Sequence, residues 1–127
     1  MDITPLIPAG RQIIESYGDG RFRVSGTLFE QSILVFPDRT LPWAPVAASE
    51  ITLEALDEIA NAGAAGTVDV LLIGCGARMA MMPAELRRAL RAAGIVIEPM
   101  DTGAACRTYN VLMAEGRLVA AALIAVG

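Results

Sequence analysis

A Gly-x-Gly loop is the first pattern in this sequence that could do chemistry. The run Val68 to Ile73, apolar except for Asp69, leads into Gly74-Cys75-Gly76, and Glu98 follows Gly74 by 24 positions. In dinucleotide-binding folds such glycines let backbone N–H groups approach a pyrophosphate, and an acidic residue about 20 positions later binds the ribose. Here Met79 stands where the third glycine belongs, and the next helix is predicted to begin only near Pro83. A glycine-permitted turn at the edge of a sheet is the main interpretation, and a phosphate-binding loop is the alternative.

The stretch Asp101 to Asn110 is the second candidate for a binding site. On the predicted helix Tyr109 shares the apolar face, Arg107 points the other way and Asn110 lies on the flank. If the strands before Gly74 and Asp101 are parallel neighbours, both features lie at the carboxyl edge of one sheet, where open α/β folds bind ligands. The alternatives are a small anion or carboxylate site, or a helix cap followed by ordinary packing. The candidate ligand-binding residues are Gly74, Gly76, Asp101, Thr102, Arg107, Tyr109 and Asn110.

All ten basic residues are arginines, and four of them lie on or just before one predicted helix. In an acidic protein such a cluster can dock an acidic partner, and a solvated helix face is the alternative. The methionines that precede the helix, Met79, Met81 and Met82, indicate an adaptable contact surface or the cap of a core, and we favour the core. The candidate partner-docking residues are Arg78, Arg87, Arg88 and Arg91.

The composition excludes several kinds of active site. The chain has no histidine, which rules out histidine triads, histidine metal ligands and a histidine pH switch. Cys75 and Cys106 cannot make a four-ligand zinc site, and we expect both to be free thiols. Asp101-Thr102-Gly103 spells the aspartic protease tripeptide, but that chemistry needs a second aspartate motif and none is present. No catalytic residue, metal or cofactor is therefore predicted, and the balance favours a protein that is not an enzyme.

Length and charge set further bounds. The 127 residues predict one domain, 1–127, and the net charge of −4 gives no reason to expect nucleic-acid binding. No signal or transit peptide is visible at the N-terminus. The longest apolar run, Leu118 to Val126, is far shorter than the roughly 20 residues of a membrane-spanning helix. We therefore expect a cytoplasmic protein with no direct membrane insertion.

The order of predicted elements indicates the fold class. Residues 1–45 are β-rich, with a hairpin turn at Gly18-Asp19-Gly20, and prolines on both sides of Trp43 argue against a regular element there. We expect Trp43 to plug the end of the core. Residues 50–127 follow the order α-β-α-β-α-β, which predicts a three-layer α/β domain with a parallel or mixed sheet. The strands are predicted at 12–17, 21–25, 27–29, 32–36, 68–73, 95–98 and 118–125, the last one central. The helices are predicted at 52–61, with Leu53 on the apolar face, at 83–93, with Leu86 and Leu90 as an apolar pair and Gly94 just past the end, and at 101–115. The alanine-rich stretch 61–66 is expected to be a loop.

Several short stretches carry a resemblance to a known family. They are Leu71-Leu72-Ile73-Gly74-Cys75-Gly76, Pro83, Gly94-Ile95, Glu98-x-Met100-Asp101-Thr102, Ala104-Ala105-Cys106-Arg107-Thr108-Tyr109-Asn110-x-Leu112 and Glu115-Gly116-Arg117. With them the chain resembles a family of small uncharacterised domains. Its eukaryotic members include a mitochondrial assembly factor for respiratory complex I and an adipogenesis-associated protein. The resemblance implies a three-layer α/β domain in which an antiparallel β-meander is appended to a mixed central sheet, and it implies no established activity or cofactor.

Three functional hypotheses follow. The leading one is an interaction or assembly factor whose partner is a protein, by resemblance a subunit of a respiratory membrane complex or another assembly factor. The alternative is a protein that binds a small anionic ligand, or an unrecognised enzyme, using the Gly74–Gly76 loop and the helix start at Asp101-Thr102. The third is a homo-oligomer that forms through an exposed β-edge of the N-terminal hairpins.

Overall fold

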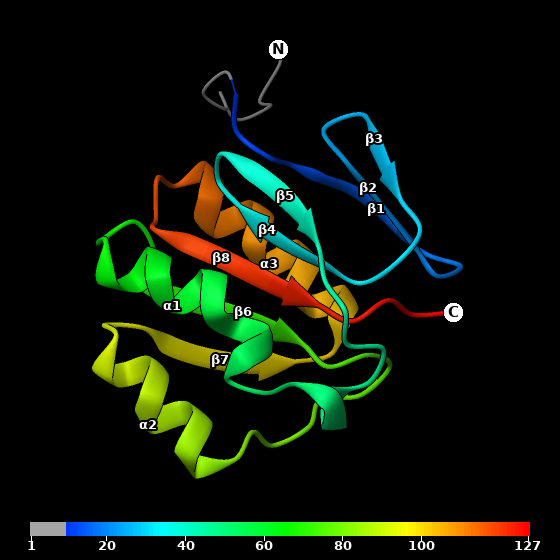
Figure 1. Cartoon of the computed structure of the whole chain (residues 1–127). Helices are drawn as coiled ribbons and strands as arrows, with labels where there is room; N and C mark the ends of the chain where they lie inside the picture. Colours follow the sequence, from blue (N-terminus) through cyan, green and yellow to red (C-terminus); the bar gives the residue numbers. More distant parts are fainter. Residues whose placement is uncertain (1–9) are drawn as a thin grey trace.

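The computed structural model describes residues 10–127 and contains two sheets and three α-helices within that range (Figure 1). The smaller sheet is an antiparallel meander, which confirms the expected β-rich start. Asp19 and Gly20 both have positive φ, 54° and 71°, so the first hairpin turn has two residues rather than the three predicted. The meander contains β1 (Ile14–Gly18), β2 (Arg21–Val24) and β3 (Thr27–Phe29).

The larger sheet is mixed and has the strand order β5-β4-β8-β6-β7. Strand β6 runs parallel to β7 and β8, whereas β4 is antiparallel to β5 and β8. The last strand is central, as its apolar character on both faces predicted, and all five of its residues are buried. The strands are β4 (Ile33–Phe36), β5 (Arg39–Pro42), β6 (Val70–Gly74), β7 (Val96–Met100) and β8 (Val119–Leu123).

Strand β5 was missed in the sequence because it ends in a proline. The Trp43 N–H donates to the Ser32 carbonyl oxygen at 2.9 Å, so the preceding backbone, at Pro42, faces away from β4. A proline at such an outward position of an edge strand removes no ladder hydrogen bond. Trp43 itself lies outside the strand and is buried, and its indole N–H donates to the Ala55 carbonyl oxygen at 2.6 Å. Trp43 belongs to the buried cluster on the α1/α2 side of the sheet, so it is part of the core.

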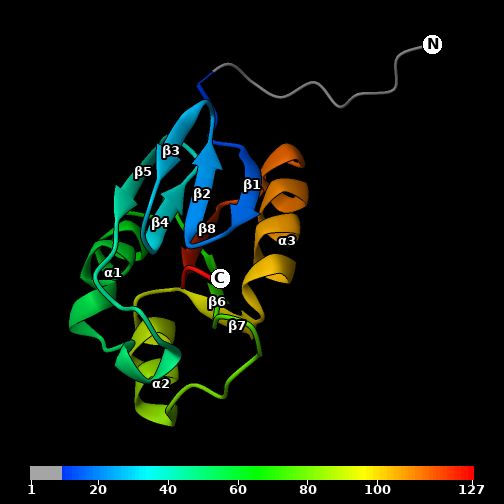
Figure 2. The same ribbon diagram turned by 90° about the vertical axis from the view of Figure 1, so that its right-hand side faces the viewer.

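Helices cover both faces of the five-stranded sheet and give the expected three layers. In the view of Figure 2, α1 (Asp57–Ala64) and α2 (Ala84–Ala92) lie on one side of the sheet and α3 (Thr102–Ala114) on the other. The meander packs beside α3, because both contribute to the same buried cluster. Two short 3-10 turns, Ala48–Glu50 and Glu54–Leu56, precede α1.

The first helix differs most from its prediction. The Thr52 hydroxyl accepts a hydrogen bond from the Ala55 N–H at 3.2 Å, but this cap starts a 3-10 turn, and α1 begins only at Asp57. The helix then runs to Ala64, through an alanine-rich stretch that was expected to be a loop. Alanine has the highest helix propensity, which outweighs the cost of Gly63. Leu53, expected on the buried face, is 47% exposed.

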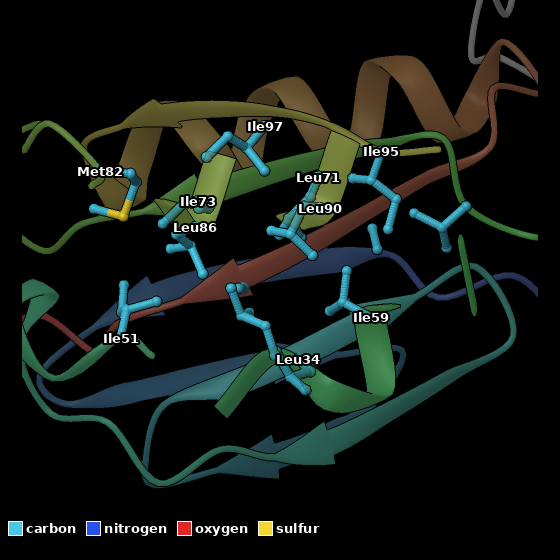
Figure 3. Packing of buried hydrophobic residues seen from close by; sticks show 14 of the residues in the cluster. Leu34, Ile51, Ile59, Leu71, Ile73, Met82, Leu86, Leu90, Ile95 and Ile97 are labelled. Carbon is cyan, nitrogen blue, oxygen red and sulfur yellow. The ribbon is translucent and has the colours of Figure 1, made fainter. Parts of the chain in front are cut away.

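The core on the α1/α2 side is built as the apolar spacing predicted (Figure 3). Leu86 and Leu90 of α2 are buried one turn apart and point at the sheet. Met82 joins the same cluster, whereas Met79 and Met81 are exposed, so only one of the three methionines belongs to the core. The loop that carries the exposed pair leads from β6 into α2.

Candidate functional site

The Gly74–Gly76 loop and the start of α3 meet at one edge of the sheet. Strands β6 and β7 are parallel neighbours, so both features follow carboxyl ends at the same edge. The Gly76 N–H donates to the Thr102 hydroxyl oxygen at 3.0 Å, and the Thr102 N–H donates to the Gly76 carbonyl oxygen at 2.9 Å. The Asp101 carboxylate accepts the Ala104 N–H at 3.0 Å and caps α3, as expected.

Hydrogen bonds at the same edge also connect the end of the central strand, β8, to the loop and to α3. The Thr102 hydroxyl donates to the Ile124 carbonyl oxygen at 2.7 Å, and the Ile124 N–H donates to the Gly74 carbonyl oxygen at 2.9 Å. Thr102 is fully buried. Its hydroxyl, one donor and two acceptor positions, therefore joins the ends of β6 and β8 to the start of α3.

The local backbone requires glycine at both positions of the loop, Gly74 and Gly76. A Cβ atom on Gly74 would lie 3.0 Å from the Thr102 Cα and Oγ1 atoms, so a side chain would push α3 away from β6. Gly76 has a φ of +102°, a conformation that side chains other than glycine rarely adopt. Glycine at these positions lets the loop and the helix start approach each other closely.

A shallow pocket of about 320 Å³ adjoins the loop on its outer side. Of the seven candidate ligand-binding residues, Gly76 alone lines it, together with Cys75, Ala77, the segment 46–48 and the segment 124–127. Glu98 is exposed in the middle of β7, opposite Leu72, and does not line this pocket. The structure therefore does not place Glu98 where a ribose-binding acid would stand beside the glycine loop.

The other three candidate ligand-binding residues lie where α3 meets the meander. The Asn110 side chain accepts the Ile14 N–H at 2.9 Å and donates to the Ile14 carbonyl oxygen at 2.8 Å, which satisfies both backbone groups. The buried Tyr109 hydroxyl donates to the Gln12 carbonyl oxygen at 3.2 Å. The exposed Arg107 guanidinium donates to the Tyr17 hydroxyl at 2.8 Å. Arg107 and Asn110 also line a second pocket of about 330 Å³, away from Gly76.

Two groups at this junction have raised pKa values because they are buried. Burial raises the pKa of the Cys106 thiol from 9.0 to about 12, although the nearby Arg107 partly opposes the shift. Burial likewise raises the pKa of the Tyr109 phenol well above its ordinary value. Both groups are therefore protonated at neutral pH, and the Cys106 thiol is a poor nucleophile. Cys75 and Cys106 are free thiols, as predicted.

The four arginines of the candidate docking face lie on α2 and on the loop before it. Arg88 and Arg91 are exposed on the outside of the helix, Arg87 is half-buried and Arg78 is exposed in the loop. Among residues 10–127, both ion pairs shorter than 4 Å involve Arg39, so none of these four is paired with a described carboxylate. Exposed Met79 and Met81 lie in the same loop as Arg78.

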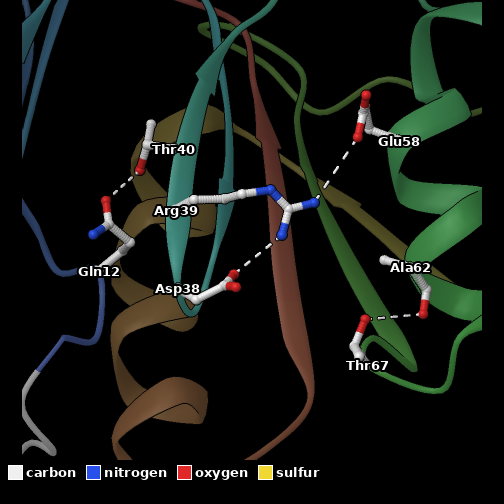
Figure 4. Close-up of polar contacts among 7 residues, drawn as sticks. All are labelled: Gln12, Asp38, Arg39, Thr40, Glu58, Ala62 and Thr67. Atoms are coloured by element: carbon white, nitrogen blue, oxygen red, sulfur yellow. Dashed lines mark hydrogen bonds and ion pairs between the residues drawn. The ribbon is translucent and has the colours of Figure 1, made fainter.

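Two further pockets were not predicted. One, of about 330 Å³, is lined by Arg11, Phe36 and Arg39, whose guanidinium stacks on the Phe36 ring at 4.0 Å and contacts Asp38 and Glu58 (Figure 4). The other, of about 260 Å³, lies between the 51–53 segment and the start of α2. The residues that line each pocket come from segments that are distant in the sequence, so no local sequence pattern predicts either pocket.

Two general features of residues 10–127 bear on function. No group of three or more His, Cys, Asp or Glu residues in this range is placed to hold a metal ion. None of the helices described there is long and apolar enough to cross a membrane.

Comparison with known proteins adds a family and several relatives. Residues 14–124 match the family model described as protein of unknown function (DUF498/DUF598). An uncharacterised protein of Rhodobacter capsulatus is 40% identical over 91% of this chain and 86% of its own length. The NADH dehydrogenase (ubiquinone) 1 alpha subcomplex assembly factor 3 of Danio rerio is 36% identical over 88% of this chain and 63% of its own length. The chain thus spans about three fifths of the assembly factor that it matches.

Solved structures share the fold over nearly the whole chain. A crystal structure described as an outer membrane protein from Bartonella henselae superposes with a TM-score of 0.86, at 37% identity over 93% of this chain and 98% of that one. A solution structure of a Bordetella pertussis protein, described as an Mth938-like domain, gives a TM-score of 0.84 at 29% identity over 100% of this chain and 95% of that one. The mixed α/β architecture is therefore shared with solved relatives.

Proposed function

The chain belongs to the DUF498/DUF598 family of proteins of unknown function, and from that premise we propose that it is a protein-binding factor in the assembly of a larger complex. The observation that carries this proposal is the relationship to complex I assembly factors, which extends over 88% of the chain. The partner is then a subunit of a respiratory membrane complex or another assembly factor. The protein acts on it from the cytoplasmic side.

The polar groups at the carboxyl edge of the sheet support a binding rather than a catalytic role. The Thr102 hydroxyl, the Gly76 N–H and the Ile124 N–H are all engaged within the protein. A general acid or base must reach the proton that it transfers, and an oxyanion site needs free donors. An assembly factor requires neither, because it works through surface complementarity.

The docking surface in this proposal is the candidate docking face of Arg78, Arg87, Arg88 and Arg91, called here the arginine face. Residues 78–91 carry four arginines and one glutamate, a local net charge of +3, in a chain whose net charge is −4. The positive electrostatic potential of this surface accelerates the encounter with an acidic partner and orients it. Arginine also binds carboxylates in a bidentate way, which adds geometric specificity.

The test is affinity purification of the full chain from its native host, with soluble and membrane fractions analysed separately by mass spectrometry. Wild type is compared with the Arg87→Glu/Arg88→Glu/Arg91→Glu variant. The proposal predicts that a subunit or assembly factor of a membrane complex co-purifies with wild type and is lost with the variant.

A matched control separates this effect from general loss of positive charge. The Arg21→Glu/Arg23→Glu variant reverses two exposed arginines on β2, in the meander, and should retain the partner. Circular dichroism confirms that each variant folds. Loss of the partner in both variants, or its retention in both, would remove the arginine face from the proposal. The absence of any specific partner of wild type in both fractions would refute the assembly role.

A second candidate function, binding of a small anionic ligand, is favoured by the 320 Å³ pocket beside Gly76. It is tested by nuclear magnetic resonance titration with inorganic phosphate, citrate and a nucleoside diphosphate. Saturable shifts centred on the amides of Gly76 and Ala77 would support a ligand site there. Shifts spread over all exposed arginines would indicate nonspecific ion binding and contradict it.

A further inference from the structure

A small apolar pocket lies directly beside the arginine face. It is lined by Ile51, Leu53, Pro83 and Leu86, with Thr52 and Glu85 at its rim, and its volume is about 260 Å³. We call it the α2 pocket. Leu53 is 47% exposed at this pocket, and Met81, two residues before Pro83, is 79% exposed. Leu53 lines the concavity and Met81 lies in the loop that leads to it, and apolar side chains this exposed near a pocket are typical of a contact surface.

The charge changes sign across the outside of α2. Glu85, Arg88 and Arg91 are spaced by three residues, so they form one ridge along the helix, each about 60° around the axis from the next. Glu85 lies at the α2 pocket, while the two arginines lie progressively further from it. Glu85 and Arg88 do not form an ion pair within 4 Å, so the arginines remain available.

Together these features define the partner more closely. We propose that the α2 pocket and the Arg88–Arg91 ridge form one recognition surface for a protein segment that inserts a large apolar side chain into the pocket and places carboxylates on the two arginines. This inference rests on the proposed function and adds the chemistry of the partner. A buried apolar anchor with charged contacts around it is the usual arrangement of an interface hot spot. The exposed Met79 and Met81 supply adaptable apolar contacts at the margin.

The charges and the shape favour a protein segment over an anionic membrane. Glu85 lines the pocket and is exposed, and the exposed Glu50 and Glu54 are next in sequence to Ile51 and Leu53 of its wall. This negative charge would repel anionic headgroups. A concave pocket of this size accepts one discrete side chain, which a peptide presents at a fixed position. A segment with its acidic residues on one side of the anchor avoids Glu85 and still reaches Arg88 and Arg91.

The experiment is site-specific photo-crosslinking of the full chain in its native host. A benzophenone amino acid replaces Leu53 at the α2 pocket in one strain and Val111, which is 57% exposed on α3, in another. The adducts are digested and the crosslinked partner peptide is sequenced by mass spectrometry. The proposal predicts an adduct from position 53 to a peptide with a large apolar residue and clustered Asp or Glu. Position 111 should give none with that protein.

Charge variants complete the test. Arg88→Glu/Arg91→Glu should lower the yield of the position 53 adduct about tenfold or more, the size expected for loss of interface hot-spot residues. Arg21→Glu/Arg23→Glu should leave the yield unchanged. An equal yield from position 111, a crosslinked peptide without acidic residues, or a lipid adduct in place of a peptide would overturn the inference. If a partner co-purifies but position 53 gives no adduct, this inference fails alone. If no partner co-purifies at all, the proposed function has failed as well.

Discussion

Gly76 and Thr102 hydrogen-bond to each other in both directions. The Gly76 N–H donates to the Thr102 hydroxyl oxygen at 3.0 Å, and the Thr102 N–H donates to the Gly76 carbonyl oxygen at 2.9 Å. The same hydroxyl donates a hydrogen bond to the Ile124 carbonyl oxygen at 2.7 Å. One buried side chain therefore joins the loop after β6, the start of α3 and the end of the central strand.

The first prediction concerns this junction. Thr102→Val keeps the shape of the side chain but leaves the Gly76 N–H and the Ile124 carbonyl without a partner. Each buried orphaned group costs about 1–3 kcal/mol, so the loss of two partners should lower the free energy of unfolding by about 2–6 kcal/mol in urea denaturation. Thr102→Ser retains the hydroxyl and should lose about 1 kcal/mol, the contribution of one methyl group. Equal stability of the two variants would show that the hydroxyl is dispensable.

The second prediction concerns the meander, which Asn110 fastens to α3 through both backbone groups of Ile14. Asn110→Ala should lower the free energy of unfolding by about 1–3 kcal/mol, because those backbone groups lose their partners. Hydrogen exchange gives the sharper readout. Protection of the Ile14 amide should fall much more than that of Leu71 in the main sheet, since the meander opens locally.

Arg107→Ala is the control for Asn110. Arg107 lies on the same helix and its exposed guanidinium contacts the Tyr17 hydroxyl, but it does not touch the Ile14 backbone. Exchange at Ile14 should be unaffected by this change. If both variants release Ile14 equally, or neither does, the paired hydrogen bonds of Asn110 do not hold the meander.

Much of the fold could be predicted because apolar spacing and caps are local. Leu86 and Leu90, the Asp101 cap and the central position of β8 were all expected and confirmed. Strand β5 was missed because Pro42 breaks the strand pattern, and only its place at an edge makes the proline harmless. The late start of α1 depends on packing of the segment that precedes it, which residue propensities do not report.

The geometry of the candidate sites was harder to predict. The sequence indicated that the Gly74–Gly76 loop and the helix start at Asp101 meet at one edge if their strands are parallel neighbours, and they do. Asn110 and Tyr109 bind the backbone of residues almost one hundred positions away, at Ile14 and Gln12. No local pattern contains such a contact, and the α2 pocket, which combines residues 51–53 with 83–86, was hidden for the same reason.

The third prediction is a loss of stability at alkaline pH. The Cys106 thiol has a pKa of about 12 in the folded protein and 9.0 ordinarily, so between these values the unfolded chain releases a proton that the folded protein keeps. The contribution of this thiol to the free energy of unfolding should therefore be level from neutral pH to about pH 8 and then fall by about 1.4 kcal/mol per pH unit between about pH 9 and pH 12. Tyr109, whose pKa is also raised, should steepen the fall above pH 10. Urea denaturation at a series of pH values measures both slopes.

A variant that lacks the Cys106 thiol separates its contribution to the alkaline fall in stability from that of Tyr109. Cys106→Ala should keep stability level up to about pH 10, where Tyr109 begins to contribute. A fall that starts at pH 9 in the Cys106→Ala variant would contradict the assignment to the buried thiol.

The last prediction compares two helical glycines that differ in what faces them. A Cβ atom on Gly63 of α1 would lie 2.6 Å from the Ala93 carbonyl oxygen, whereas one on Gly103 of α3 would lie 2.6 Å from the Tyr17 hydroxyl oxygen. Both changes to alanine gain about 1 kcal/mol of helix propensity. A backbone carbonyl cannot move without shifting the turn between α2 and β7, so Gly63→Ala should lose about 1–3 kcal/mol through overpacking. Tyr17 is 42% exposed and can rotate into solvent, which would break its exposed hydrogen bond with Arg107. Because such an exposed contact contributes little, Gly103→Ala should change the free energy of unfolding by less than about 1 kcal/mol. Urea midpoints of the two variants, measured side by side, test this prediction. A larger loss of stability for Gly103→Ala than for Gly63→Ala would contradict it, because Tyr17 would then be held more rigidly than the turn between α2 and β7.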